Sequence, residues 1–241
     1  MSRRRLIMQT SEEQSENPIL KNNLTIRAME DSLTVQFSGN NMEYCIDGDD
    51  NWMELKMNSN SKAINTGHTI SVRASQTPTV STAQGCGGFV VSKKFTLEGN
   101  VMSMYYGADA INQTSVPNSA FVALFSDNTT LISVSKDFLP AIGLNVRCYY
   151  RMFKNCTNMI AAPDLPFAGC LPSHCYTEMF YNTQVTYIKS MHILNSYMGN
   201  IYTSNWLYGV PADGTFVKNK EAQWGDTGAS GVPEGWTIIL E

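Results

Sequence analysis

The chain has 241 residues, of which 43% are hydrophobic, 10% are aromatic and only 16% carry a charge. That length allows one or two domains with a substantial core, and the low net charge with frequent aromatics argues against a disordered chain. The 17 basic and 21 acidic residues leave a net charge of -4, so no overall basic field exists to hold a nucleic acid. No run of 18 apolar residues occurs, which excludes a membrane span of that kind. Polarity supplied mainly by Asn, Ser and Thr favours a mainly β protein with short helices.

An N-terminal arm is predicted over residues 1–19. A basic triplet is followed by only three apolar residues and then by a polar stretch. An export signal needs an apolar region of about 7–15 residues, so we expect no export by that route. We interpret the arm as a segment held by a partner, and the alternative is a basic tail that is merely solvated. The docking candidates are Arg3, Arg4, Arg5, Leu6 and Ile7.

The segment from residue 20 to 97 predicts a small antiparallel β domain, which we interpret as an Ig-like sandwich. Alternating apolar and polar residues mark its half-buried strands. Strands are expected at 33–37, 44–46, 52–57, 69–74 and 88–97. Asp47, Asp49 and Asn51 imitate the first ligands of a calcium loop, but Trp52 and Asn58 stand where that loop needs Gly and Glu. Asp-Gly between alternating strands is ordinary turn chemistry, and this interpretation is preferred.

A sequence repeat with an offset of 27 or 28 residues occupies residues 98–210. Cys-Tyr-x-x-Met-Phe begins at Cys148 and returns at Cys175, and Leu124-Phe125 and Trp206-Leu207 align with its last two residues. Such a unit cannot bury its apolar face alone, so stacked copies are expected to form a short solenoid. Four residues are then expected to lie over one another, namely Phe125, Phe153, Phe180 and Leu207.

Each repeat unit is expected to contain one face of a short helix followed by a brief strand. The expected strands are 131–135, 159–162 and 185–189, with 101–105 as the strand of an incomplete first unit. Asn155 and Asn182 close the turn before each strand, where a side-chain amide can satisfy backbone groups of the neighbouring coil.

Motifs that would carry catalysis, a cofactor or a metal are not found. No zinc spacing, dinucleotide fingerprint or nucleophile elbow occurs, and Gly85-Cys86-Gly87-Gly88 is interpreted as a bend before a strand. His174 beside Cys175 could suggest a thiol nucleophile, but Cys175 occupies a core position of the repeat. We therefore predict no catalytic, cofactor-binding or metal-binding residues, and we expect the six cysteines to be reduced.

A family resemblance is carried by Phe-x-Asn-Cys-Thr-x-Met-x-x-Ala-Pro-x-Leu-Pro at residues 153–166. This stretch resembles the repeat of BspA-like leucine-rich-repeat proteins, which occur in gut anaerobes and their tailed, crAss-like phages. The closing part of such proteins is similar to the segments 214–219 and 231–238. The β-rich domain that precedes their repeats is similar to the segments 24–31 and 99–107. The resemblance implies a solenoid at 98–210 and a C-terminal cap at 211–241. Thr183 departs from it, because the preceding unit has a cysteine there.

The resemblance implies a non-enzymatic virion structural protein: a head fibre, decoration or tail-associated subunit, assembled in the host cytoplasm. The arm would contact other virion proteins within a larger assembly, and the outward solenoid would bind a host surface glycan or protein. The alternative is a BspA-like adhesin on the bacterial cell surface, and a glycan hydrolase would require two carboxylates about 5–10 Å apart in a cleft. Tyrosines that vary between units offer contact area at low entropy cost, so we predict recognition through Tyr150, Tyr181 and Tyr187.

Overall fold

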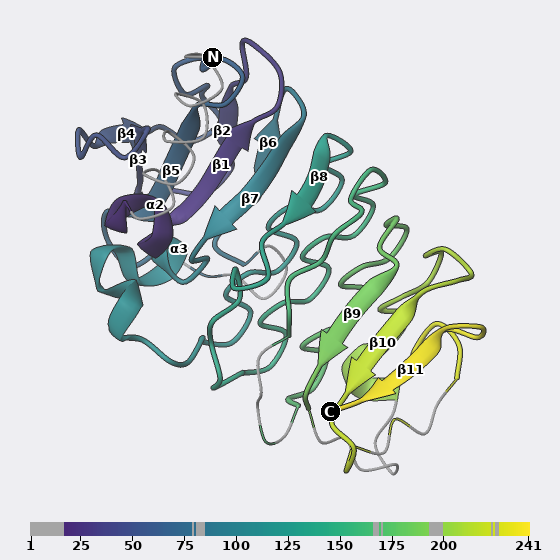
Figure 1. Ribbon diagram of the computed structural model, residues 1–241. Helices are drawn as coiled ribbons and strands as arrows, with labels where there is room; N and C mark the ends of the chain where they lie inside the picture. The colour runs from purple at the N-terminus through teal and green to yellow at the C-terminus, as the bar shows by residue number, and fades with distance from the viewer. Residues whose placement is uncertain are drawn as a thin grey trace.

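A computed structural model shows a mainly β chain with a few short helices, as the composition predicted, and no closed barrel among the described residues (Figure 1). The structure describes residues 17–78, 80, 85–165, 169, 171–192, 200–222, 224 and 227–241. Within these ranges no helix is long and apolar enough to cross a membrane.

The front half contains a six-stranded sheet faced by a two-stranded one. In spatial order the large sheet comprises β4 (Met53–Leu55), β3 (Met42–Ile46), β5 (Thr69–Ala74), β1 (Leu24–Ala28), β7 (Phe95–Gly99) and β8 (Leu131–Val134). The small sheet pairs β2 (Val35–Phe37) with β6 (Phe89–Val91). Alternate residues point inward, as in β1, where Leu24, Ile26 and Ala28 are buried in the core. The predicted strands of this half are therefore found, except that 88–97 is divided into β6 and β7.

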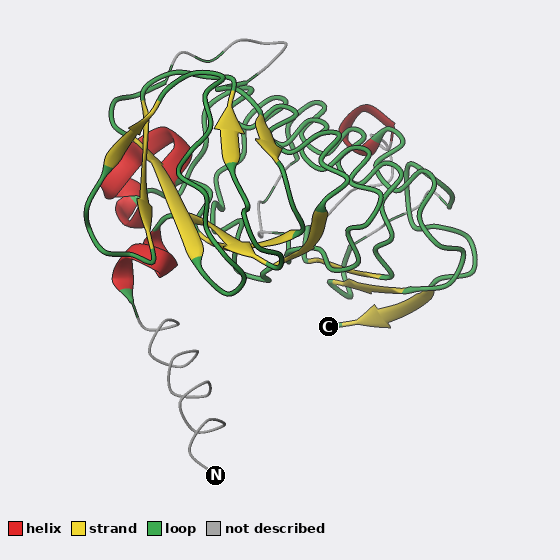
Figure 2. Ribbon diagram, turned by 90° about the horizontal axis from the view of Figure 1, so that it is seen from above, coloured by secondary structure: helices red, strands yellow, loops and turns green. Residues whose placement is uncertain are grey.

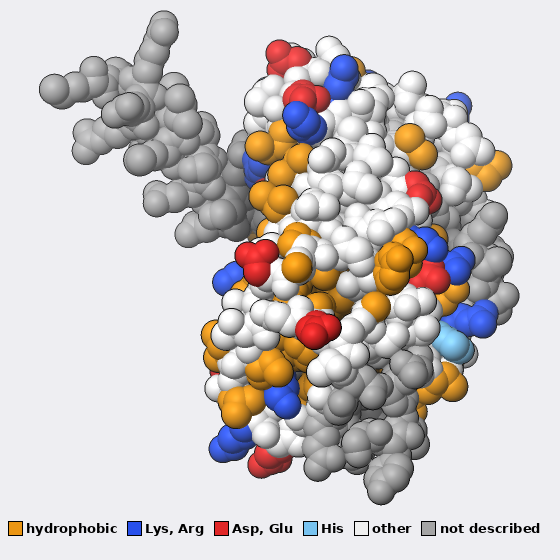
Figure 3. All heavy atoms as spheres, turned by 90° about the vertical axis from the view of Figure 1, so that its right-hand side faces the viewer, with side chains coloured by type: hydrophobic (Ala, Val, Ile, Leu, Met, Phe, Trp, Pro, Cys, Tyr) orange, Lys and Arg blue, Asp and Glu red, His pale blue; other side chains and the backbone are white. Residues whose placement is uncertain are grey.

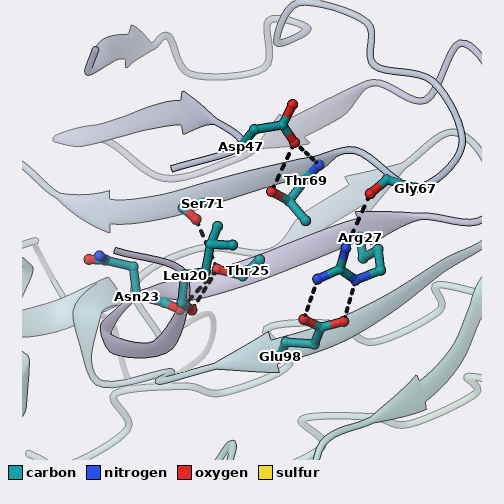
Figure 4. Close-up of polar contacts among 9 residues, drawn as sticks. All are labelled: Leu20, Asn23, Thr25, Arg27, Asp47, Gly67, Thr69, Ser71 and Glu98. Carbon is teal, nitrogen blue, oxygen red and sulfur yellow. Dashed lines mark hydrogen bonds and ion pairs between the residues drawn. The ribbon is translucent and has the colours of Figure 1, made fainter. Parts of the chain in front are cut away.

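A short helix, α2 (Pro18–Asn22), packs on the outer face of the large sheet. Asn17 caps it by accepting a hydrogen bond from the Ile19 amide, and Pro18 suits the first helical turn. Thr25 Oγ1 donates to the carbonyl of Leu20 at 3.0 Å and lies 2.9 Å from Ser71 Oγ, so the helix is held against the sheet near the start of β1 (Figure 4). The helix thus crosses the boundary at residue 19 that we predicted between arm and β domain.

The predicted strand at 101–105 is wrong. Gly99 ends β7 with a φ of +75°, and a Cβ there would lie 2.0 Å from the carbonyl oxygen of Asn23. The chain then turns into α3 (Ser103–Tyr106) and the 3-10 helix η1 (Gly107–Asn112). Ser103 Oγ donates to the carbonyl of Val72 and accepts from the amide of Leu24, which holds α3 against the end of the sheet.

The second half of the chain runs in successive coils stacked side by side (Figure 1). The pairing between β7 and β8 is parallel, and it joins the first coil directly to the front half. Further along, β9 (Tyr187–Ser190), β10 (Thr215–Lys218) and β11 (Thr237–Leu240) form a parallel three-stranded sheet, and α4 (Asn200–Thr203) precedes the last coils. The predicted strands at 131–135 and 185–189 correspond to β8 and β9. Residues 159–162 make only a single bridge, at Ala161, because Pro163 has no amide hydrogen to extend the ladder.

The predicted short helices of the repeat are wrong, because each of these segments is a chain of turns. Some amides bond three residues back, as from Met152 to Tyr149, while others bond to the next coil, as from Phe153 to Met179 at 3.0 Å. Every fourth residue has a positive φ, which interrupts any helix. These residues are Ser119, Ala123 and Asp127 in one coil, Arg147, Arg151 and Asn155 in the next, and His174, Glu178 and Asn182 in the third.

Two columns of aromatic rings run through the stacked coils. The first joins Phe89, Phe125, Phe153 and Phe180, with neighbouring ring centroids 5.1, 5.9 and 5.7 Å apart. The second joins Phe121, Tyr149, Tyr176 and Trp206, at 5.9, 6.1 and 6.2 Å. The expected stacking of Phe125, Phe153 and Phe180 is therefore confirmed. Trp206 rather than Leu207 meets the end of the first column, with its ring 6.4 Å from that of Phe180, and Leu207 is buried beside it.

A ladder of polar side chains connects the ends of the turn segments. Asn155 Nδ2 donates to Asp127 Oδ1 at 2.8 Å, and Asn182 Nδ2 donates to Asn155 Oδ1 at 3.0 Å. The two asparagines were expected to satisfy backbone groups of the neighbouring coil, but they bond to side chains instead. Gly209 occupies the next position of the ladder and ends it, because glycine has no side chain to donate or accept. A Cβ at this position would lie 2.3 Å from Asn182 Oδ1.

Candidate functional site: an aromatic and cationic turn surface

The turns of the stacked coils lie on the side opposite β9, β10 and β11 (Figure 2). The turns of three consecutive coils carry a cluster of tyrosines and cations. We call this cluster the turn-wall patch. It consists of Arg147, Tyr150, Arg151, Lys154, Glu178, Tyr181 and Tyr208.

One line of the patch is a column of equivalent repeat positions, because Lys154, Tyr181 and Tyr208 follow each other at offsets of 27. Lys154 Nζ lies 4.9 Å from the ring centroid of Tyr181. The rings of Tyr181 and Tyr208 are stacked, with centroids 4.8 Å apart and an angle of 15° between their planes. Tyr208 is 49% exposed, so this pair presents a preformed aromatic platform to solvent.

The second line of the patch is built around the Glu178 carboxylate. Arg151 Nε lies 2.7 Å and Lys154 Nζ 2.5 Å from Glu178 Oε2. Burial raises the pKa of Glu178, but the hydrogen bonds from Lys154 and Arg151 outweigh it, and the pKa is lowered overall. Glu178 is therefore ionised at neutral pH and holds both cations in place.

Tyr150 is also fixed by cations. The guanidinium carbons of Arg151 and Arg147 lie 4.7 and 5.7 Å from its ring centroid. Three cations and one carboxylate leave a local charge of +2, although the whole chain carries -4. The patch can therefore contact a flat apolar group and attract a negative one, which is the chemistry of a binding surface.

The structure brings together two of the three predicted recognition residues, Tyr150 and Tyr181. Tyr187 is 40% exposed but lies in β9, on the strand side, where it lines a groove with Ser133 and Ile160. Sequence reasoning missed the three cations and Tyr208. The 27-residue offset from Tyr181 to Tyr208 was the signal that could have found the stacked pair. The arm candidates Arg3, Arg4, Arg5, Leu6 and Ile7 lie outside the described residues.

Other residues considered for chemistry are engaged in local structure. Asp47 and Gly48 both have a positive φ, and the Asp49 amide bonds to the Ile46 carbonyl, which confirms the turn interpretation. Asp47 also accepts a hydrogen bond from the Thr69 amide at 2.8 Å (Figure 4). Cys175 is buried in the core, as its repeat position predicted. Among the described residues no group of three or more His, Cys, Asp or Glu side chains could hold a metal ion.

Comparisons of the chain with protein-family models, with curated proteins and with solved structures return no match. The patch lies on a molecule whose surface carries few charges, since only 16% of the residues are charged. Figure 3 shows that surface at the C-terminal end of the stack, where charged side chains are scattered among mostly neutral ones.

Proposed function

We propose that the chain is a non-enzymatic attachment protein of a phage particle: a head fibre, decoration or tail-associated subunit. In this proposal residues 1–16 dock on other virion proteins, and the coiled half of the chain faces outward toward the bacterial surface. The observation that carries the proposal is the exposed stack of Tyr181 and Tyr208 beside the cations of the turn-wall patch. Rigid aromatic side chains flanked by arginine are typical of protein recognition surfaces.

For the fold we propose a BspA-like leucine-rich-repeat solenoid at 98–210 with a cap at 211–241. The repeat offset, the parallel pairings between coils and the two aromatic columns support this classification. For residues 20–97 we propose an Ig-like sandwich whose second sheet is reduced to β2 and β6. The contact between Phe37 and Phe89 in the small sheet and their packing in the common core support it.

The first experiment tests binding by the turn-wall patch. Labelled protein is applied to cells of the bacterium that the phage infects. The amount of bound label is measured at increasing salt concentration. We expect binding that weakens with salt, because exposed charges on the patch are screened. The combined change Tyr150→Ser, Tyr181→Ser and Tyr208→Ser is expected to reduce binding at least tenfold, since each tyrosine supplies exposed contact area.

A matched control is Tyr187→Ser, which removes an exposed tyrosine from the strand side of the same coils. It is expected to bind as the unaltered protein does. If Tyr187→Ser abolishes binding while the triple change leaves it intact, recognition occurs on the strand side and the patch is not the site.

The second experiment separates the phage proposal from the alternative of a bacterial BspA-like adhesin. Antibodies against the chain are applied to purified particles and to uninfected cells, and both are examined by electron microscopy. Label on particles supports the virion proposal, and deletion of residues 1–16 is then expected to prevent incorporation without reducing cell binding. Label confined to the surface of uninfected cells would replace the virion proposal with the adhesin.

A further inference from the structure

A second hollow lies in the front half and is lined by residues of β3, β5, α3 and η1. Figure 1 shows where β3, β5 and α3 lie in the fold. It has a volume of about 400 Å³, within the range of about 300–1,000 Å³ typical of small-molecule sites. Its chemistry comes from Glu43, Arg73, Thr77, Tyr105, Tyr106 and Asp109. None of these residues belongs to the turn-wall patch, so the hollow requires its own explanation.

The hollow exists because Gly107 lets η1 approach the end of β5. Gly107 has a φ of +58°, and a Cβ at this position would lie 2.5 Å from the carbonyl oxygen of Ala74. A residue with a side chain would be strained there and would push the two segments apart. This close approach places the tyrosines of α3 next to the cross-strand pair Glu43 and Arg73.

The pair of Glu43 and Arg73 has unused hydrogen-bonding capacity, in contrast to a similar pair in the same sheet. Arg27 and Glu98 are saturated: two guanidinium nitrogens bond to the two carboxylate oxygens at 2.6 and 2.8 Å, and a third bonds to the Gly67 carbonyl (Figure 4). Arg73 bonds to Glu43 only through Nε, at 2.6 Å. Its two terminal nitrogens and Glu43 Oε2 make no hydrogen bond to any described residue, although both arginines are about equally exposed, at 22 and 23%.

The unused groups of Arg73 and Glu43 are held in fixed positions. The Arg73 guanidinium lies 3.7 Å from the ring centroid of Trp52, which restricts it to one plane. The result is a planar donor beside an acceptor, which matches two neighbouring hydroxyl groups that each donate and accept.

The other side of the hollow combines aromatic rings with a positioned carboxylate. The rings of Tyr105 and Tyr106 meet edge to face with centroids 4.9 Å apart, and the Tyr106 hydroxyl donates to the Ser115 carbonyl. Asp109 is held by hydrogen bonds from the side chains of Asn112 and Gln113. Pre-organised side chains of this kind lose little entropy when a ligand binds.

We propose that this hollow binds one neutral hexose unit of a glycan. Arg73 donates to, and Glu43 accepts from, adjacent sugar hydroxyls, while the apolar C–H face of the sugar contacts the tyrosine rings. Two carboxylates and one guanidinium surround the hollow, so an anionic sugar or a nucleotide phosphate is disfavoured. The inference is independent of the virion or adhesin proposal, because it uses no residue of the turn-wall patch.

The test is saturation-transfer NMR with three neutral probes, methyl β-D-glucopyranoside, methyl α-D-mannopyranoside and methyl β-D-galactopyranoside, and one anionic probe, methyl β-D-glucuronide. We expect at least one neutral glycoside to bind with millimolar affinity and the glucuronide to bind more weakly. Amide shifts of the unaltered protein are expected at residues 73–77 and 105–109, which locates the site without any variant.

The decisive variants are Arg73→Gln and its matched control Arg27→Gln, because both arginines are half of a cross-strand ion pair in the same sheet. Arg73→Gln is expected to weaken binding at least tenfold, and Arg27→Gln and the triple tyrosine change in the patch are expected to leave it intact. Four outcomes would overturn the proposal: no neutral glycoside binds, the glucuronide binds best, both arginine variants lose binding equally, or the amide shifts occur elsewhere. If Arg73→Gln does not fold, Tyr105→Ala replaces it with the same expectations.

Discussion

The polar ladder at the ends of the turns allows a quantitative prediction for Asn155→Ala. Asn155 donates to Asp127 at 2.8 Å and accepts from Asn182 at 3.0 Å, so one side chain connects three coils. It also has a φ of +60°, a left-handed conformation that asparagine adopts at lower cost than alanine, although Ala123 also adopts it in the preceding coil. The substitution therefore removes two hydrogen bonds and adds backbone strain.

The magnitude follows from these terms. Two partly exposed hydrogen bonds contribute about 2 kcal/mol in total, and placing alanine in the left-handed region costs about 1 kcal/mol more. We expect Asn155→Ala to lower the free energy of unfolding by about 3 kcal/mol. A matched control is Asn158→Ala, because Asn158 makes one hydrogen bond to the preceding coil, from Nδ2 to the Thr129 carbonyl, and its φ is not positive. It is expected to lose about 1 kcal/mol.

Equilibrium unfolding in urea, followed by tryptophan fluorescence, measures both variants. Three of the four tryptophans, Trp206, Trp224 and Trp236, lie in the last coils, and Trp206 is fully buried. Their emission therefore reports whether the stack beyond the ladder remains folded. If Asn155→Ala costs no more than Asn158→Ala, the polar ladder does not connect the coils energetically as predicted.

Three further predictions concern the core, the acid stability and the thiols. Phe153→Ala, in a fully buried ring stacked on both sides, should cost about 3–5 kcal/mol in the same urea assay, and Phe153→Leu clearly less; equal losses would contradict the column. Because the folded pKa of Glu178 is lowered, its contribution to stability is present above the unfolded value of 4.5 and disappears as pH falls through the folded value. Glu178→Gln should therefore lose less stability than the unaltered protein when acidified, and parallel pH curves would argue against the ion pairs. In a Cys170→Ser background, Ellman's reagent should not react until urea unfolds the chain, since burial raises the pKa of the Cys86 and Cys148 thiols to about 12; fast reaction of the folded protein would show that they are exposed.

The candidate sites could be predicted only in part from the sequence. Tyr150 and Tyr181 were found because they vary between units whose neighbouring positions repeat. Their cationic neighbours were missed, since the contact between Lys154 and Tyr181 exists only when consecutive coils stack. The hollow proposed to bind a sugar could not be recognised in the sequence. Glu43, Arg73 and Tyr105 are each about 30 residues apart along the chain, and only the sheet and α3 bring them together.

By itself, the sequence determined the mainly β composition, the strands with alternating burial and the 27-residue spacing that stacks Phe125, Phe153 and Phe180. These features are local or strictly periodic, so they can be read without knowing the fold. Tertiary structure decided that the repeat segments are turns. A helix and a chain of four-residue turns both repeat their buried positions about every four residues, and the hydrogen bonds to the next coil and the recurring positive φ distinguish them. Tertiary structure also decided that Trp206 rather than Leu207 meets the aromatic column. The Trp206 ring packs at the same time against the rings of Phe216 and Trp224 in the segment that follows.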